Sequence, residues 1–153
     1  MRRKLKIILL FSFVVTGILI PGCKKDNNDN GQNTLMTAKL DGHDWSTSEV
    51  YANNNSGYLN IVGSNPLKGT ITFTLNDFSE GTFELGNDIH TFGTYTNKDQ
   101  ITYFTNPYGS GQVSITSIDT EGKYITGTFN FIAKSISGNS ITATEGSFTT
   151  QYD

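Results

Sequence analysis

The chain of 153 residues has few of the residues that form disulfides, ligate metals or bind phosphates. It has one cysteine, two histidines and, after position 3, no arginine. A lone cysteine cannot form an internal disulfide, and a zinc site would need more histidine or cysteine. A nucleic-acid backbone selects basic stripes, which this chain lacks. We therefore expect no metal, no cofactor and no nucleic-acid partner.

Long apolar runs are also scarce, and the clearest one, Ile7–Ile20, is too short to span a membrane. It has about 14 residues, whereas a bilayer core needs about 20, and it ends at Pro21 and Gly22. Four basic residues lie just before it, within positions 2–6. A basic segment, a short apolar segment and a small residue at the cut are the parts of a secretory signal peptide. We expect residues 1–22 to be this signal.

Cys23 follows the signal directly, and together they resemble the lipobox of bacterial lipoproteins. The resemblance implies cleavage before Cys23 and lipidation of its thiol, which makes membrane lipid the first expected partner. Several acyl chains on one residue would anchor the protein firmly. Pro21 departs from the pattern, because lipoboxes usually carry a small or β-branched residue there. An ordinary signal peptide followed by an incidental cysteine is the alternative.

Residues 23–33 continue from the cysteine as a polar tether. Positions 24–33 read KKDNNDNGQN and contain no apolar residue that could support a packed structure. The segment resembles the lysine- and aspartate-rich stretch of surface-exposed lipoproteins in Bacteroidota-type bacteria. That resemblance implies an outer-membrane anchor with the domain on the cell surface; the periplasmic face is the alternative.

Residues 34–153 form one domain in which apolar and polar residues alternate in short runs between turns rich in Asn, Asp and Gly. The last third predicts a three-stranded meander, Gln112–Asp119, Lys123–Ala133 and Ser140–Thr150, with irregularities near Ser117 and Gly146. Further strands are expected at Met36–Leu40, Glu49–Asn53, Tyr58–Ser64, Thr70–Asn76, Gly81–Leu85, Thr91–Thr96 and Ile101–Thr105. No segment shows helical periodicity.

This pattern predicts an all-β fold, a single antiparallel β-sandwich of about nine or ten short strands. A lipocalin-like closed or partly open barrel is the alternative. Removal of residues 1–22 would take away four of the 11 basic residues and none of the 14 acidic ones, so the mature chain would carry a net charge of −7.

Several segments resemble a family of small Bacteroidota lipoproteins of unknown function. They are the opening MTAKLDGHDW at 36–45, the central GTFELG at 81–86, and the runs VSITSID at 113–119 and ITGTFNF at 125–131. The resemblance implies an all-β exported domain. It implies no catalytic residue.

Two groups of polar residues are candidates for chemistry, and each has a simpler interpretation. Asp41, His43 and Asp44 offer metal ligands, but a β-turn accounts for Asp and Gly at these positions. Asp77, Glu80 and Glu84 are the best group of carboxylates for a glycosidase, which needs two across a sugar cleft. Because Glu84 alternates with apolar neighbours on a strand, we expect it to face solvent.

Aromatic residues are the better candidates for recognition, because Tyr and Trp combine apolar area with a hydrogen-bonding tip. An aromatic platform for a sugar or a protein could be formed by Trp45, Tyr51, Tyr58, Tyr95, Tyr103 and Tyr108. Of these we single out Trp45, Tyr103 and Tyr108 as possible ligand-binding residues, and Tyr108 lies in an expected loop. The sequence thus favours a non-enzymatic binding or structural lipoprotein. Its ligand would be a glycan, a protein or a small apolar molecule. A glycosidase-like envelope hydrolase is the alternative.

Overall fold

The computed structural model describes residues 34–153. The expected signal peptide, Cys23 and the tether lie outside the described residues. Residues 34–153 fold into strands and turns, and no helix among them is long and apolar enough to cross a membrane. The all-β prediction is confirmed.

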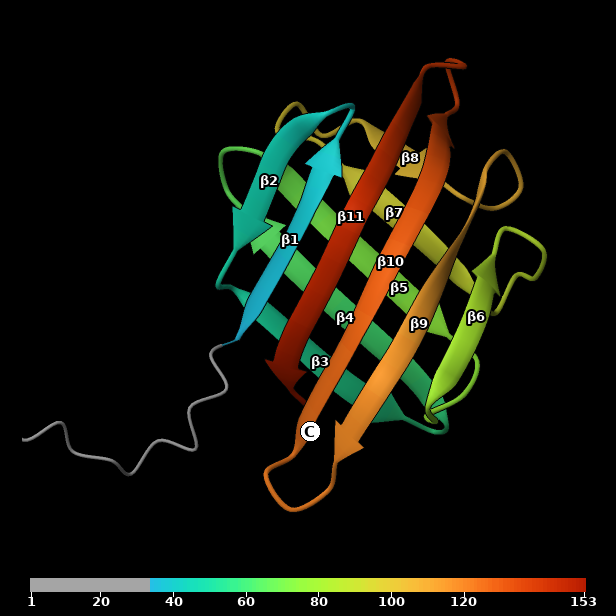
Figure 1. Ribbon diagram of the computed structural model, residues 1–153. Helices are drawn as coiled ribbons and strands as arrows, with labels where there is room; N and C mark the ends of the chain where they lie inside the picture. Colours follow the sequence, from blue (N-terminus) through green and yellow to red (C-terminus); the bar gives the residue numbers. More distant parts are fainter. Residues whose placement is uncertain (1–33) are drawn as a thin grey trace, which may run out of the picture.

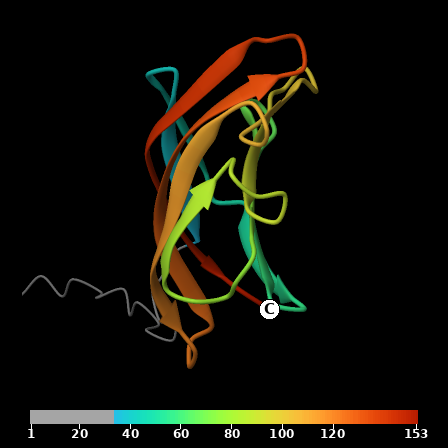
Figure 2. The ribbon, with the colours of Figure 1, turned by 90° about the vertical axis from the view of Figure 1, so that its right-hand side faces the viewer.

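Eleven strands form one antiparallel sheet that folds over into two layers, as a β-sandwich (Figures 1 and 2). The first layer runs in the order β2 (His43–Thr47), β1 (Leu35–Leu40), β11 (Ser140–Gln151), β10 (Tyr124–Ser135), β9 (Ser110–Asp119) and β6 (Gly81–Leu85). The second runs in the order β8 (Thr102–Phe104), β7 (Phe92–Thr96), β5 (Gly69–Leu75), β4 (Tyr58–Asn65) and β3 (Val50–Asn55).

The two layers are joined along both sides. On one side, the end of β10 pairs with β8 through Lys134 and Ser135. On the other side, Ala52 of β3 forms an isolated parallel bridge with Tyr152, and the buried Thr150 hydroxyl donates a 2.9 Å hydrogen bond to the Val50 carbonyl. The C-terminal residues therefore fasten β11 to the edge of the opposite layer.

An aromatic cluster fills the space between the layers. The ring of Phe73 on β5 lies 4.9 Å from that of Phe129 and 6.0 Å from that of Phe131, both on β10. All three side chains are buried. Direct contact of the two layers through these rings is the core of a sandwich rather than the ligand cavity of a lipocalin-like barrel.

The predicted meander and both of its irregularities are confirmed. Strands β9, β10 and β11 pair consecutively, and the β9–β10 register shifts between Ile115 and Ser117. In β11 the register shifts before Gly146 against both neighbouring strands. There Glu145 has a positive φ of 53°, and its carboxylate pairs with Lys39 of β1 at 2.8 Å.

The expected turn at residues 41–44 is wrong in its extent. The hairpin turn uses only Asp41 and Gly42, with φ of 49° and 82°, and β2 begins at His43. Two successive positive φ values fit the two-residue turns that match the twist of paired strands. Ser56 and Gly57 make a similar turn, with φ of 55° and 87°, so β3 also continues further than expected.

Candidate ligand-binding cleft

Four hairpin turns gather at one end of the sandwich, the upper end in Figure 1. They join β1 to β2, β4 to β5, β7 to β8 and β10 to β11. A cleft of about 560 Å³ opens among them. It is lined by Leu40, Asp41, His43, Asp44, Trp45, Leu67, Lys68, Tyr95, Asn97, Lys98, Asp99 and Ile141.

Two buried aromatic side chains form the wall of the cleft, and their polar tips are already bonded. Trp45 Nε1 donates to the Gly69 carbonyl at 3.3 Å, and the Tyr95 hydroxyl donates to the Lys68 carbonyl at 2.7 Å. Both bonds hold the β4–β5 turn against the wall. Burial raises the pKa of the Tyr95 hydroxyl. The aromatic rings therefore form a mostly buried apolar wall, and Leu67 adds exposed apolar surface at the rim, where it is 81% exposed.

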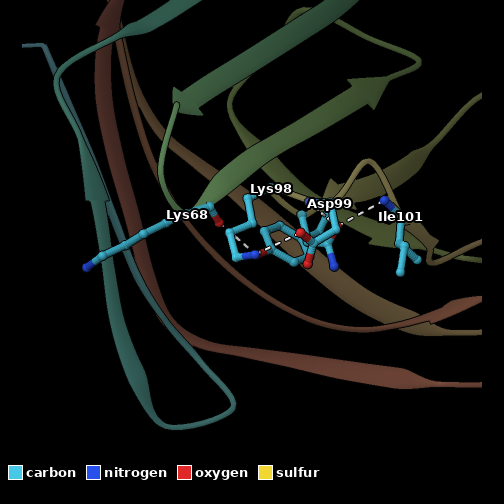
Figure 3. A network of polar contacts seen from close by, with 6 residues as sticks. Lys68, Lys98, Asp99 and Ile101 are labelled. Atoms are coloured by element: carbon cyan, nitrogen blue, oxygen red, sulfur yellow. Dashed lines mark hydrogen bonds and ion pairs between the residues drawn. The ribbon is translucent and has the colours of Figure 1, made fainter.

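The charged groups of the rim are held by the protein itself. Lys68 Nζ donates to the Asp44 carbonyl at 2.8 Å, which ties the β4–β5 turn to β2. Lys98 and Asp99 form an ion pair of 2.7 Å on the β7–β8 turn. Figure 3 shows Lys68 pointing away from that pair. These three charged side chains, Lys68, Lys98 and Asp99, thus surround the apolar wall and have partners within the protein.

The β7–β8 turn is braced by one asparagine side chain. Asn97 Oδ1 accepts hydrogen bonds from the backbone N–H of Asp99 at 3.0 Å and of Ile101 at 2.9 Å. Asparagine commonly stabilises turns in this way. This side of the cleft is therefore formed before any ligand arrives.

The candidate metal ligands at 41–44 have different surroundings. Asp41 Oδ1 accepts a 2.8 Å hydrogen bond from the Thr142 backbone N–H, and this bond joins the turn to β11. His43 and Asp44 line the cleft and are exposed. Within residues 34–153, no three His, Cys, Asp or Glu side chains come together as a metal site. Asp41 has the turn role that its sequence context indicated.

The candidate carboxylates lie away from the cleft and serve local structure. Asp77 accepts hydrogen bonds from the Phe78 N–H and the Ser79 hydroxyl, both at 2.8 Å. Glu80 accepts a 3.1 Å bond from the Ile118 N–H, and Glu84 is exposed on β6 as expected. None of the three lines the cleft.

The three aromatic candidates lie in different places. Trp45 lines the cleft. Tyr103 lies behind it, half-buried, with its ring 5.9 Å from that of Tyr95. Tyr108 is 56% exposed in the β8–β9 loop and does not line the cleft. Tyr95, one of the wider set of aromatic candidates, lines the cleft. Sequence reasoning did not find Lys68, because its role depends on which turns meet.

The fold and cleft define an all-β sandwich domain with an open pocket at one end. Residues 32–150 match the family described as a domain of unknown function, DUF6252. The chain belongs to this family, in agreement with the expected family of unknown function. Comparisons with curated proteins and with solved structures give no match.

Proposed function

We propose that this protein is a lipid-anchored binding protein of the outer membrane, facing the cell surface, and that its ligand is a small molecule with one apolar face. It is non-enzymatic in this proposal. The supporting observation is the position of the cleft relative to the start of the domain. Leu35, at the beginning of β1, pairs with Thr149, whereas Leu40 at the other end of β1 lines the cleft and pairs with Ala143.

This arrangement suits a protein anchored at Cys23. A strand advances about 3.3 Å per residue, so the six residues of β1 separate its two ends by roughly 17 Å. A tether entering at Leu35 would hold the opposite end, with the cleft, away from the membrane. A ligand arriving from outside would then reach the cleft without approaching the lipid.

The dimensions and lining of the cleft support a small amphipathic ligand. Its volume of about 560 Å³ lies within the usual range of small-molecule sites, roughly 300–1,000 Å³. An apolar face would pack on Leu67 and Ile141, next to the buried rings of Trp45 and Tyr95, while polar groups of the ligand would meet the rim. A non-enzymatic role is supported by Asp41 and by the Lys98–Asp99 pair, whose charged groups already have partners within the protein.

Trp45 provides a direct test of binding, because it is the only tryptophan of the chain. Titration with a library of small amphipathic molecules, sugars included, should change its fluorescence for at least one of them. Leu67→Glu should abolish the response by placing a charge at the rim. Ile136→Glu is the matched control, because Ile136 is 89% exposed on the neighbouring turn and does not line the cleft. An equal effect of the two variants, or no response to the library, would contradict the cleft as a binding site.

Location is tested separately by fractionation and protease treatment of cells. The wild-type protein should sediment with outer membranes, and Cys23→Ala should move it to the soluble fraction. Protease added to intact cells should remove the wild-type domain. Protection until lysis would overturn the surface location, and an unchanged membrane fraction for Cys23→Ala would overturn the anchor.

A further inference from the structure

The outer face of the second layer carries no charged side chain at its outward strand positions. These positions follow from the alternation of buried and exposed residues along β3, β4, β5, β7 and β8 and from their shared register. We call this surface the neutral face. It comprises Tyr51, Asn53, Asn55, Tyr58, Asn60, Val62, Ser64, Thr70, Thr72, Thr74, Phe92, Thr94, Thr96, Thr102 and Phe104.

The opposite layer shows that this is not a property of the whole surface. Its outward positions include Lys39, Glu84 and Glu145. Charges also border the neutral face: Glu49 lies just before β3, and Lys134 of β10 pairs with Phe104. Charge is thus present around the neutral face and absent from its strands.

Hydroxyl groups run across the neutral face in rows. Ser64 and Thr70 share a hydrogen bond of 3.2 Å, and Thr96 and Thr102 share one of 3.0 Å. Because Thr70 lies opposite Thr96, these four side chains form one row over β4, β5, β7 and β8. Neighbouring strands lie about 4.8 Å apart, so the row has a regular spacing.

The two threonines at the centre differ from the rest. Thr72 and Thr94 lie opposite each other on β5 and β7. Among residues 34–153, neither hydroxyl has a hydrogen-bond partner. The surrounding hydroxyls do: Ser64 bonds to Thr70, Thr96 bonds to Thr102, and Thr74 donates to Asn60 Oδ1. Val62 and Phe104 flank this pair in the same row. The centre of the neutral face therefore offers unpaired hydroxyls beside apolar surface.

We propose that the neutral face binds an uncharged polysaccharide lying across its strands. Sugar rings combine apolar C–H faces with hydroxyl groups and carry no charge, which matches a surface of threonine, tyrosine and phenylalanine. Anionic polysaccharides and lipid headgroups would find no cation on it. Protein partners usually engage aromatic or arginine anchors. The neutral face has no arginine, and the side chains at its centre, Thr72 and Thr94, are small and polar. This site is separate from the cleft and does not depend on it.

The test is sedimentation of the full-length protein, in detergent, with cellulose, chitin, xylan, mannan and starch. At least one of these should retain the protein, and retention should not change between about 0.05 and 0.5 M NaCl, since no ion pair is involved. Polygalacturonate, an anionic polysaccharide, should not retain it. Failure of all five neutral polysaccharides would overturn the proposal.

Matched variants locate the binding surface. Thr72→Lys and Thr94→Lys should each weaken retention about tenfold or more, because a hydroxyl contact is lost and a charge must be desolvated. Thr128→Lys makes the same change on the outward face of β10 and should retain wild-type binding. Leu67→Glu, at the cleft, should also bind normally. Equal retention of all four variants would overturn the assignment, as would a change of oligomeric state on Thr72→Lys, which would indicate a protein interface.

Discussion

A methyl group added at Gly127 should destabilise the sandwich, because two rigid groups already occupy that space. A Cβ at this position would lie 2.5 Å from Phe148 Cζ and 2.5 Å from the Ser114 carbonyl oxygen. Phe148 is buried on β11, and Ser114 belongs to the β9–β10 ladder. Overpacking of this kind costs about 1–3 kcal/mol, whereas alanine recovers about 0.5–1 kcal/mol relative to glycine. We expect Gly127→Ala to lower the free energy of unfolding by about 1–2 kcal/mol.

Gly63→Ala is the matched control. Its Cβ would lie 2.6 Å from Met36 Sδ and 3.2 Å from Trp45 Cη2. Met36 can shift, because its unbranched thioether chain has three rotatable bonds. We expect Gly63→Ala to change stability by less than about 1 kcal/mol.

Urea unfolding followed by circular dichroism measures both variants, and the denaturant slope should stay unchanged. If Gly127→Ala were as stable as wild type, the argument that the Ser114 carbonyl and the Phe148 ring cannot move away from the added methyl group would be refuted. Equal destabilisation of the two variants would refute the distinction between rigid and flexible neighbours.

Two further hydrogen bonds give predictions of the same kind. Burial raises the pKa of the Tyr95 hydroxyl, so the unfolded chain loses the hydroxyl proton near pH 10 while the folded chain still holds it. The contribution of this proton to the free energy of unfolding is therefore complete below pH 10 and is lost as the pH rises through the folded pKa. Thermal melts across this range should show a shallower alkaline decline for Tyr95→Phe than for wild type; parallel declines would contradict it. Thr150→Val should cost about 1–3 kcal/mol, because the Val50 carbonyl loses its donor. Thr150→Ser keeps the hydroxyl and should lose less in urea unfolding, and equal losses would exclude the hydrogen bond as the cause.

Most strands could be predicted because alternation directly encodes which face of a strand is buried. Gly81–Leu85 has the bounds that the sequence indicated, and the irregularity near Gly146 was visible as a slip in the apolar pattern. β2 was missed because its short run follows a polar turn, and the boundary depends on the backbone angles of Asp41 and Gly42. Alternation carries no information about these angles.

The cleft could be predicted only in part. Trp45 was a reasonable choice from its chemistry, and it does line the cleft. Tyr95 on β7 and Lys68 in the β4–β5 turn are separated in sequence and meet only through the pairing of β4, β5 and β7. Strand order determines which turns meet at one end of a sandwich. The local alternation of apolar and polar residues does not encode strand order.

The pairing of β1 with β11 also determines when the domain can form. The hydroxyls of Thr37 and Ser147, 110 positions apart in sequence, meet at 3.0 Å. Contacts so distant in sequence slow folding, because the intervening chain must be ordered before they form. During synthesis β1 would emerge before β11, and it would lack this neighbouring strand until β11 is made. The sandwich is therefore completed only after β11 is available.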